Sequence, residues 1–206
     1  MRIPWVVKLG GSLWASPLLP RWLEQLAAGN VIIVPGGGLF ADAVRRAQDR
    51  WGFDDHVAHA MAISAMTQYG QMLQGLCREL RVATERQALL EANRVGRSII
   101  WLPDPRALEN ASLRASWDVT SDSLAAWLAR QLAAEHLLLV KSRSVPTGAC
   151  RLSDLVAEGL LDPAFPETAD SQPGAIWVSG PEHPEFCEVG LMNPSSYFTR
   201  VMTNPG

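Results

Sequence analysis

Two lysines are the residues of this chain whose type and position point most directly to chemistry. Lysine and arginine together number 18, yet only Lys8 and Lys141 are lysines, and each ends an apolar run typical of a buried strand. The end of such a strand borders the crevice where α/β folds bind ligands, and an ammonium group suits phosphate oxygens. An arginine-biased composition is the alternative, but it does not explain why these two lysines remain. We interpret them as a pair that acts on a transferring phosphoryl group.

Two glycine-rich segments follow apolar runs in the same way. Gly10-Gly11 comes after the first run, and Gly36-Gly37-Gly38 comes after the second and opens a helical pattern. Glycine amides can approach a phosphate closely, and a helix N-terminus favours anions. Either segment alone is typical of a tight turn, whereas two of them in one chain favour a phosphate-binding role.

Two acidic residues, Asp118 and Asp122, flank the start of a later helical pattern. Both could be ordinary acids that match the positive end of a helix dipole. Beside two lysines, a carboxylate can also orient the ammonium groups and keep them charged, or hold a magnesium ion that bridges phosphates. The functional interpretation therefore requires Lys8, Lys141 and one of these acids to meet in one crevice.

Short β-rich runs alternate with longer helical patterns, which indicates an α/β fold with a mainly parallel sheet covered by helices. Strands are expected at residues 5–9, 31–35, 98–102, 137–141 and 175–179, with a weaker one at 197–202. Helices are expected at residues 18–28, 39–50, 54–81, 121–134 and 152–160, and Thr84 is expected to cap a further helix that ends before Gly96. Prolines 163, 166 and 173 predict a surface loop.

The composition is that of an ordinary globular protein. The chain has 206 residues, 48% hydrophobic and 19% charged, and we expect a single domain over residues 1–206. A formal charge of −3 without a basic stripe argues against nucleic-acid binding, and no apolar run approaches the roughly 20 residues of a membrane span. The first residues do not resemble a signal peptide, so we expect a cytoplasmic protein. Three widely spaced cysteines fit free thiols better than disulfides or a zinc site.

Three motifs in register resemble the amino acid kinase family. They are Lys8-Leu9-Gly10-Gly11-Ser12, Pro35-Gly36-Gly37-Gly38 and Thr120-Ser121-Asp122-Ser123-Leu124-Ala125-Ala126, and their order and spacing agree over about residues 3–141. The resemblance implies a three-layer α/β/α sandwich around a mainly parallel sheet, the carbamate kinase-like fold. Acceptor and ATP would meet over the carboxyl ends of the strands, with an acceptor-binding part at about residues 1–120 and a shortened nucleotide-binding part at about residues 121–206.

The resemblance also implies roles for individual residues. Lys8 and Lys141 would neutralise the transferring phosphoryl group, and Asp122 would organise both lysines. The implied phosphate- or nucleotide-binding residues are Gly10, Gly11, Ser12, Thr120 and Ser121, and the implied acceptor-binding residues are Gly36, Gly37, Gly38, His59 and Asp118. ATP and Mg²⁺ are the implied cofactors, with no metal ligand assigned among the side chains. A homodimer or higher homo-oligomer is expected through the helix at residues 54–81, whose methionines and alanines fit either the core or a subunit contact.

Within the family, residues 59–70 and 117–123 most resemble kinases that phosphorylate aminomethylfuranmethyl phosphate in methanofuran biosynthesis, a branch of one-carbon metabolism. That resemblance implies an ATP-dependent phosphotransferase that turns a small phosphate monoester into a diphosphate. His59 would donate a hydrogen bond to the acceptor phosphate, or else it is an ordinary histidine on a helix face.

After Lys141 the chain departs from the family. Many members have Thr-Asp-Val-Asp-Gly near the nucleotide, whereas this chain continues with Ser142-Arg143-Ser144-Val145 and lacks the acids. Two alternatives therefore stay open. One is a kinase for a carboxylate or a different phosphate acceptor, and the other is a non-catalytic member that binds nucleotides or anions.

Overall fold

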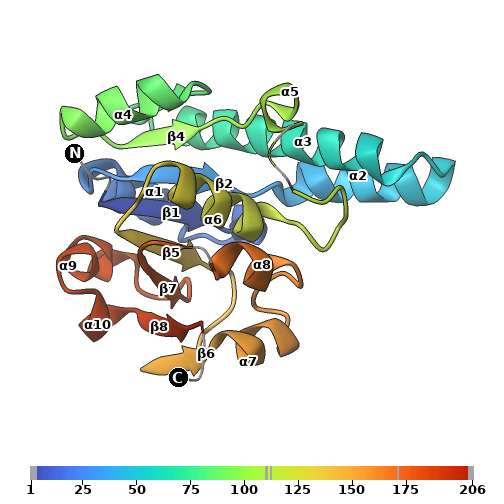
Figure 1. Ribbon diagram of the computed structural model, residues 1–206. Coiled ribbons are helices and arrows are strands. Elements are labelled where there is room, and N and C mark those ends of the chain that lie inside the picture. The colour runs from blue at the N-terminus through green and yellow to red at the C-terminus, as the bar shows by residue number, and fades with distance from the viewer. Residues whose placement is uncertain (1–3, 110, 112, 171, 204–206) are drawn as a thin grey trace.

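The computed structural model describes residues 4–109, 111, 113–170 and 172–203 and has the three-layer α/β/α architecture (Figure 1). Within these residues one sheet runs in the order β3-β4-β2-β1-β5-β7-β8-β6. Its strands are β1 (Trp5–Leu9), β2 (Ile32–Pro35), β3 (Arg81–Ala83), β4 (Ile99–Trp101), β5 (His136–Val140), β6 (Ala149–Arg151), β7 (Ala175–Ser179) and β8 (Thr199–Met202). The helices are α1 (Leu19–Ala28), α2 (Gly38–Trp51), α3 (Asp55–Leu76), α4 (Arg86–Arg94), α5 (Pro105–Leu108), α6 (Ser121–Gln131), α7 (Leu152–Ala157), α8 (Phe165–Ala169), α9 (Cys187–Met192) and α10 (Pro194–Tyr197), with short 3₁₀ turns η1 (Gly11–Ala15) and η2 (Pro184–Phe186).

The central strand β1 lies between β2 and β5, and all three strands are parallel. Val7 is in register with Ile33 of β2 and Leu138 of β5, and every residue of β1 is buried. A parallel sheet that is covered on both faces needs apolar side chains on both, which explains the uninterrupted apolar runs of the sequence. Only the pair β7 and β8 is antiparallel among the strand pairs of the described residues.

Two apolar layers cover the sheet, one on each face. Val6 belongs to the cluster that includes Leu124 of α6, whereas Val7 belongs to the cluster that includes Trp22 of α1. Successive side chains of a strand alternate between faces, so β1 anchors both layers and its end is held firmly in place.

None of the helices described is long and apolar enough to cross a membrane.

The structure confirms the predicted elements nearest to the glycine and lysine motifs. β1 and β7 have the expected bounds, and α6 begins at Ser121 as predicted. Thr120 is its N-cap, and the threonine side chain accepts a hydrogen bond from the backbone N–H of Asp122. The helix is shorter than predicted, however, because it ends at Gln131, and Ala133 then has a left-handed backbone with φ of 50°.

Two edge strands were not predicted, and both have only three residues. The helix expected to reach residue 81 ends at Leu76, and β3 then pairs with β4. β6 pairs with β8 at the other edge. Strands this short carry too few residues to show two-residue alternation, so the sequence pattern missed them. The N-cap of α4 is Glu85 and not Thr84.

The surface loop predicted around prolines 163 and 166 is wrong, because this segment contains α8 and buries Phe165 and Ala169. Pro166 lies in the first turn of α8, where proline is tolerated since its missing N–H has no helical partner. Two other predicted elements of this half are present but shorter. α7 ends at Ala157, and β8 begins at Thr199.

Candidate active site

The two lysines lie at the ends of adjacent parallel strands. Lys8 is the fourth residue of β1, Lys141 follows β5 directly, and Leu9 of β1 is in register with Val140 of β5. The backbone N–H of Gly10 donates a 2.9 Å hydrogen bond to the carbonyl of Val140. Both lysines therefore reach the same carboxyl-end edge of the sheet, as expected from their positions after apolar runs.

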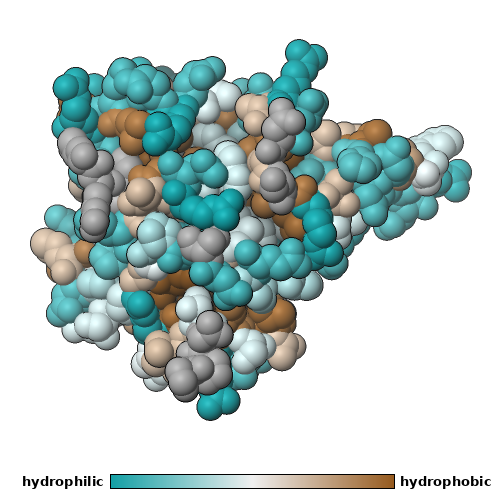
Figure 2. Space-filling model, in the orientation of Figure 1, coloured by the Kyte–Doolittle hydropathy of each residue, from teal (hydrophilic) through white to brown (hydrophobic). Residues whose placement is uncertain are grey.

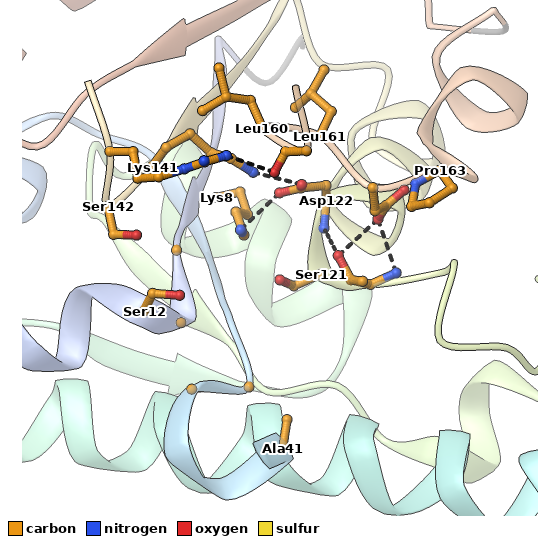
Figure 3. A pocket seen from close by; sticks show the side chains of 18 of the residues that line it. Lys8, Ser12, Ala41, Ser121, Asp122, Lys141, Ser142, Leu160, Leu161 and Pro163 are labelled. Carbon is orange, nitrogen blue, oxygen red and sulfur yellow. Dashed lines mark hydrogen bonds and ion pairs between the residues drawn. The ribbon is translucent and has the colours of Figure 1, made fainter. Parts of the chain in front are cut away.

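Asp122 of α6 binds both lysines through its two carboxylate oxygens. Oδ1 forms an ion pair of 2.8 Å with Nζ of Lys8, and Oδ2 accepts a 2.7 Å hydrogen bond from Nζ of Lys141. The side chains are 6%, 12% and 4% exposed for Lys8, Lys141 and Asp122. Figure 3 shows the two lysines directed at the aspartate from one side. The structure thus brings together the three residues that the sequence analysis required to converge.

Burial and the neighbouring charges shift the proton affinities of this cluster. Burial by itself would raise the pKa of Asp122, but Lys141 and Lys8 overcome that effect and hold the pKa well below its usual range. Burial lowers the pKa of Lys141 to about 8, with Asp122 opposing and Lys8 reinforcing the change. Asp122 is therefore a carboxylate at neutral pH, whereas Lys141 is a cation that can lose its proton in mildly alkaline solution.

The two glycine segments touch each other beside this cluster. A Cβ atom placed on Gly11 would collide with the backbone of Gly38, and one placed on Gly36 would collide with the backbone of Gly11. Gly38 has φ of +52°, a left-handed conformation that glycine adopts at little cost. The backbone N–H of Gly36 also donates a 2.9 Å hydrogen bond to the carbonyl of Leu9. Glycine at these positions lets both loops meet at the N-terminus of α2.

A cleft of about 730 Å³ opens over these groups. Its walls include all of the predicted catalytic and phosphate-binding residues, namely Lys8, Gly10, Gly11, Ser12, Thr120, Ser121, Asp122 and Lys141, and two of the predicted acceptor-binding residues, Gly37 and Gly38. In Figure 3, Ser12 and Ala41 lie across the open space from Asp122. The rest of the wall comes from Ala41, Asp42 and residues 142–143, 156 and 158–163, which the sequence analysis did not assign to the site.

His59 lines a smaller cavity of about 100 Å³ that adjoins the cleft. The two share the wall residues Gly37, Ala41, Thr120 and Ser121. In the smaller cavity the guanidinium carbon of Arg45 lies 4.2 Å from the centroid of the Trp117 ring, a cation–π contact. Burial, and to a lesser degree His56, lowers the pKa of His59, so this imidazole is neutral at physiological pH.

Two of the predicted acceptor residues do not line these cavities. Asp118 is exposed and lies outside both lining sets, although its backbone carbonyl accepts a 3.2 Å hydrogen bond from Ala164 N–H. Gly36 is buried against the backbone of Gly11 and contributes to the contact between the two glycine loops.

Asp162 is the buried acid that the sequence analysis missed. It lines the cleft next to Asp122, and only 6% of the residue is exposed. The signal in the sequence was an acid directly after the apolar pair Leu160-Leu161, between the predicted helix at residues 152–160 and the loop predicted from Pro163. Arg143 was also unassigned, and its guanidinium donates hydrogen bonds of 3.2 and 3.0 Å to the carbonyls of Glu158 and Gly159.

Comparison with known proteins decides the family. A model described as "Amino acid kinase family" matches residues 4–144, which include both lysines, both glycine segments and the start of α6. The chain belongs to the amino acid kinase family. A curated relative, [5-(aminomethyl)furan-3-yl]methyl phosphate kinase of Methanocaldococcus jannaschii, is 29% identical over 141 residues. The aligned part covers 65% of this chain and 63% of that relative.

Solved structures with low sequence identity share the amino acid kinase fold. Uridylate kinase from Archaeoglobus fulgidus superposes with a TM-score of 0.74 at 15% identity, over 97% of this chain and all of that one. Isopentenyl phosphate kinase from T. acidophilum superposes with a TM-score of 0.62 at 12% identity, again over 97% of this chain and 100% of the other. The expected fold is therefore confirmed.

Proposed function

We propose that this amino acid kinase is an ATP-dependent phosphotransferase that converts a small phosphate monoester into a diphosphate. The observation that carries the proposal is the convergence of two ammonium groups on one buried carboxylate, in a cleft walled by two glycine loops. Such a cluster offers positive charge at a fixed point, which is the main requirement of phosphoryl transfer. The family and the curated relative, which is named as a phosphate kinase, support it.

In the proposed reaction an oxygen of the acceptor phosphate attacks the γ-phosphorus of ATP. The new P–O bond forms as the bond to the β-phosphate bridging oxygen breaks, and ADP leaves with that electron pair. Lys8 and Lys141 neutralise the charge on the transferring group and the bridging oxygen, and Asp122 keeps both ammonium groups in place. An acceptor phosphate is already ionised at neutral pH, so the step needs no strong general base.

The cavity around His59 suits the acceptor. It adjoins the cleft at Gly37 and Ser121, and its lining holds Arg45 and His59 but no acidic residue. An anionic acceptor fits this lining, because Arg45, which stacks on the Trp117 ring, offers a positive charge. We accordingly assign the acceptor side to about residues 1–120, the nucleotide side to the remainder, and aminomethylfuranmethyl phosphate as the first acceptor to test.

Mg²⁺ fits this site as a companion of ATP and not as an ion held by the protein alone. Among the described residues, no three histidine, cysteine, aspartate or glutamate side chains are grouped to hold a metal ion. Both oxygens of Asp122 are bound to lysines. Mg²⁺ would neutralise part of the triphosphate charge, and hydroxyl groups such as those of Ser12 and Thr120 lie along the cleft where that charge would sit.

One feature favours a second candidate, a non-catalytic member that binds nucleotides or anions. Where many family members carry acids after the second lysine, this chain places Arg143, which is bonded to two backbone carbonyls of its own nucleotide side. That change alters the surroundings of the nucleotide but leaves Lys8, Asp122 and Lys141 intact.

ADP release separates the candidates. The protein is incubated with Mg-ATP and a panel of phosphate monoesters that includes furan derivatives, the matching alcohols and several carboxylates. We expect ADP formation with a phosphate monoester and none with its alcohol, and a diphosphate product by ³¹P NMR. Turnover confined to carboxylates would replace the proposed acceptor class, and tight ATP binding without turnover across the panel would favour the non-catalytic member.

A further inference from the structure

Asp162 makes more hydrogen bonds to α6 than a single helix cap requires. Its Oδ2 accepts from Thr120 N–H at 2.9 Å, Thr120 O–H at 2.8 Å and Ser123 N–H at 3.1 Å. Its Oδ1 accepts from Ser123 O–H at 2.7 Å. Asp162 lies 39 residues along the chain from Ser123, in the link between α7 and α8. It therefore ties the link between α7 and α8 to the first turn of the helix that carries Asp122.

All four bonds are donated to Asp162, which shows the charge state that they favour. A carboxylate only accepts hydrogen bonds, whereas a protonated acid would have to donate one. Burial and the nearby Asp122 raise the pKa of Asp162, and the bonds from Ser123 and Thr120 oppose that rise. Four donors around a single buried side chain fit the ionised form, so the site holds two carboxylates beside two ammonium groups.

We propose that Asp162 is a positioning residue for phosphoryl transfer, which holds the first turn of α6 and adds a negative charge that keeps Lys141 protonated. The inference rests on the proposed kinase function. It assigns Asp162 no contact with the substrate, because the carboxylate oxygens are taken up by Thr120 and Ser123. Its effect reaches the reacting groups through the position of Asp122 and through the charge around Lys141.

The charged groups that surround Lys141 come from several elements. Asp122 on α6 is in direct contact at 2.7 Å, Lys8 on β1 shares that carboxylate, and Asp162 lies in the link after α7. Burial and Lys8 lower the pKa of Lys141, whereas Asp122 and Asp162 raise it. Asp42 of α2, Arg143 and Glu158 also line the cleft. Asp122 contributes most through its charge and its hydrogen bond, and the charge of Asp162 adds a smaller contribution of the same sign, which its removal takes away.

The rival explanation is a purely structural cap that holds α6 and nothing more. The two explanations differ in what the charge does. A cap is weakened by the loss of any of its hydrogen bonds, whereas among Asp162, Thr120 and Ser123 only Asp162 carries a charge that changes the pKa of Lys141. Ser123→Ala provides the matched control, since it removes the 2.7 Å bond to Asp162 while the carboxylate stays.

The test uses the fact that the chain has two lysines. Labelling with [ε-¹³C]lysine gives two NMR signals, and the signal that disappears in the Lys8→Arg variant belongs to Lys8. The chemical shifts of both signals are then followed against pH in the ligand-free protein. We expect Asp162→Asn to move the titration midpoint of Lys141 to lower pH and Ser123→Ala to leave it in place. If the Lys141 midpoint is unchanged in both Asp162→Asn and Ser123→Ala, or shifts equally in both, Asp162 is only a structural cap of α6. If Asp162→Asn does not fold, Asp162→Ser removes the same charge and retains an oxygen acceptor.

Activity supplies the second readout. The pH profile of kcat/KM for ATP reports ionisations of the free enzyme, and its fall at alkaline pH should follow the loss of the Lys141 proton. In Asp162→Asn this fall should therefore move to lower pH by the same amount as the titration midpoint of Lys141. If the Lys141 titration midpoint shifts but the alkaline fall of kcat/KM does not move, the proposed role of Asp162 in phosphoryl transfer would be overturned. A wild-type protein that transfers no phosphoryl group would refute the proposed function instead, and the NMR titration would still report whether Asp162 controls the charge of Lys141.

Discussion

A single carboxylate shared by two ammonium groups is the central feature at the scale of residues. Asp122 is almost fully buried, and each of its oxygens faces one lysine. An uncompensated pair of cations in such a place would be costly, so the aspartate makes the positive cluster possible. When phosphate oxygens enter the cleft, they meet ammonium groups that are already oriented and need little rearrangement.

Lys8→Ala should lower kcat by about 10²- to 10³-fold, because the ammonium stabilises charge that develops in the transition state. The far-UV circular dichroism spectrum should stay unchanged. Arg46 on α2 is exposed and lines neither cavity. Arg46→Ala is therefore the control variant, because it also removes one positive charge but does so away from the site. Steady-state ADP release measures both variants. Equal kcat for Lys8→Ala and the parent on an accepted substrate would contradict the catalytic role.

Asp122→Asn should destabilise the protein in a pH-dependent way. The folded pKa of Asp122 lies below the unfolded value of about 3.9, so its stabilising contribution is complete above that value and is lost as pH falls through the folded pKa. At pH 7 the variant removes the carboxylate that both buried ammonium groups contact, at a cost of about 3–5 kcal/mol. Urea unfolding at pH 7, 5 and 3 should show the difference from the parent shrinking at the lowest pH. A pH-independent difference would show that packing, not charge, holds this site.

At the scale of elements, the contact between the two glycine loops sets the shape of the cleft. Backbone atoms of Gly11 and Gly36 approach so closely that neither position accommodates a side chain. The loops follow β1 and β2, which are neighbours in the sheet, so strand pairing brings them together. The result is a set of main-chain amides beside the ammonium groups, at the N-terminus of α2.

Gly11→Ala should weaken ATP binding and destabilise the fold by about 1–3 kcal/mol, since the added methyl group forces the loops apart. Gly75→Ala is the matched control. Gly75 lies within α3 with no atom near the position of a new Cβ, so alanine there should stabilise the protein by about 0.5–1 kcal/mol. Thermal unfolding and the KM for ATP measure both effects. A Gly11 variant with parental KM would show that the loop contact does not shape the nucleotide site.

At the scale of the whole molecule, α2 and α3 project beyond the sheet as a helical pair (Figure 1). Apolar side chains are exposed on this projection, at Trp51 of α2 and at Val57 and Met61 of α3. Ala65 and Met66, further along α3, are buried. Figure 2 shows the projection standing clear of the main body. Exposed apolar groups together on one projection fit the two-fold subunit contact that we expect for α3.

The protein should therefore be a dimer at micromolar concentration, and Met61→Glu should shift it towards the monomer, because a buried unpaired carboxylate opposes association. Val95→Glu, an exposed position next to α4, is the control and should leave the mass unchanged. Multi-angle light scattering measures both. His59 lies two residues from Met61 and lines the acceptor cavity, so loss of the dimer should also raise the KM for the acceptor. A monomeric parent protein would remove this expectation.

The sequence alone determined the order of the central elements and singled out Lys8, Lys141 and Asp122, which the structure brings together. Apolar runs that end at a lysine or at glycine identified β1, β2 and β5, because a parallel sheet buried on both faces leaves an uninterrupted apolar pattern. Local rules also located the start of α6, since Thr120 provides a capping side chain.

Only the tertiary structure decided how these parts meet. The strand order, which places β1 beside β5, brings Lys141 next to Lys8 across more than 130 residues of chain. Asp162 became visible as part of the site only when α8 folded against α6, because its partners Thr120 and Ser123 are distant in sequence. Short edge strands and the helix in a proline-rich segment depend on packing instead of local pattern, and for that physical reason the sequence could not reveal them.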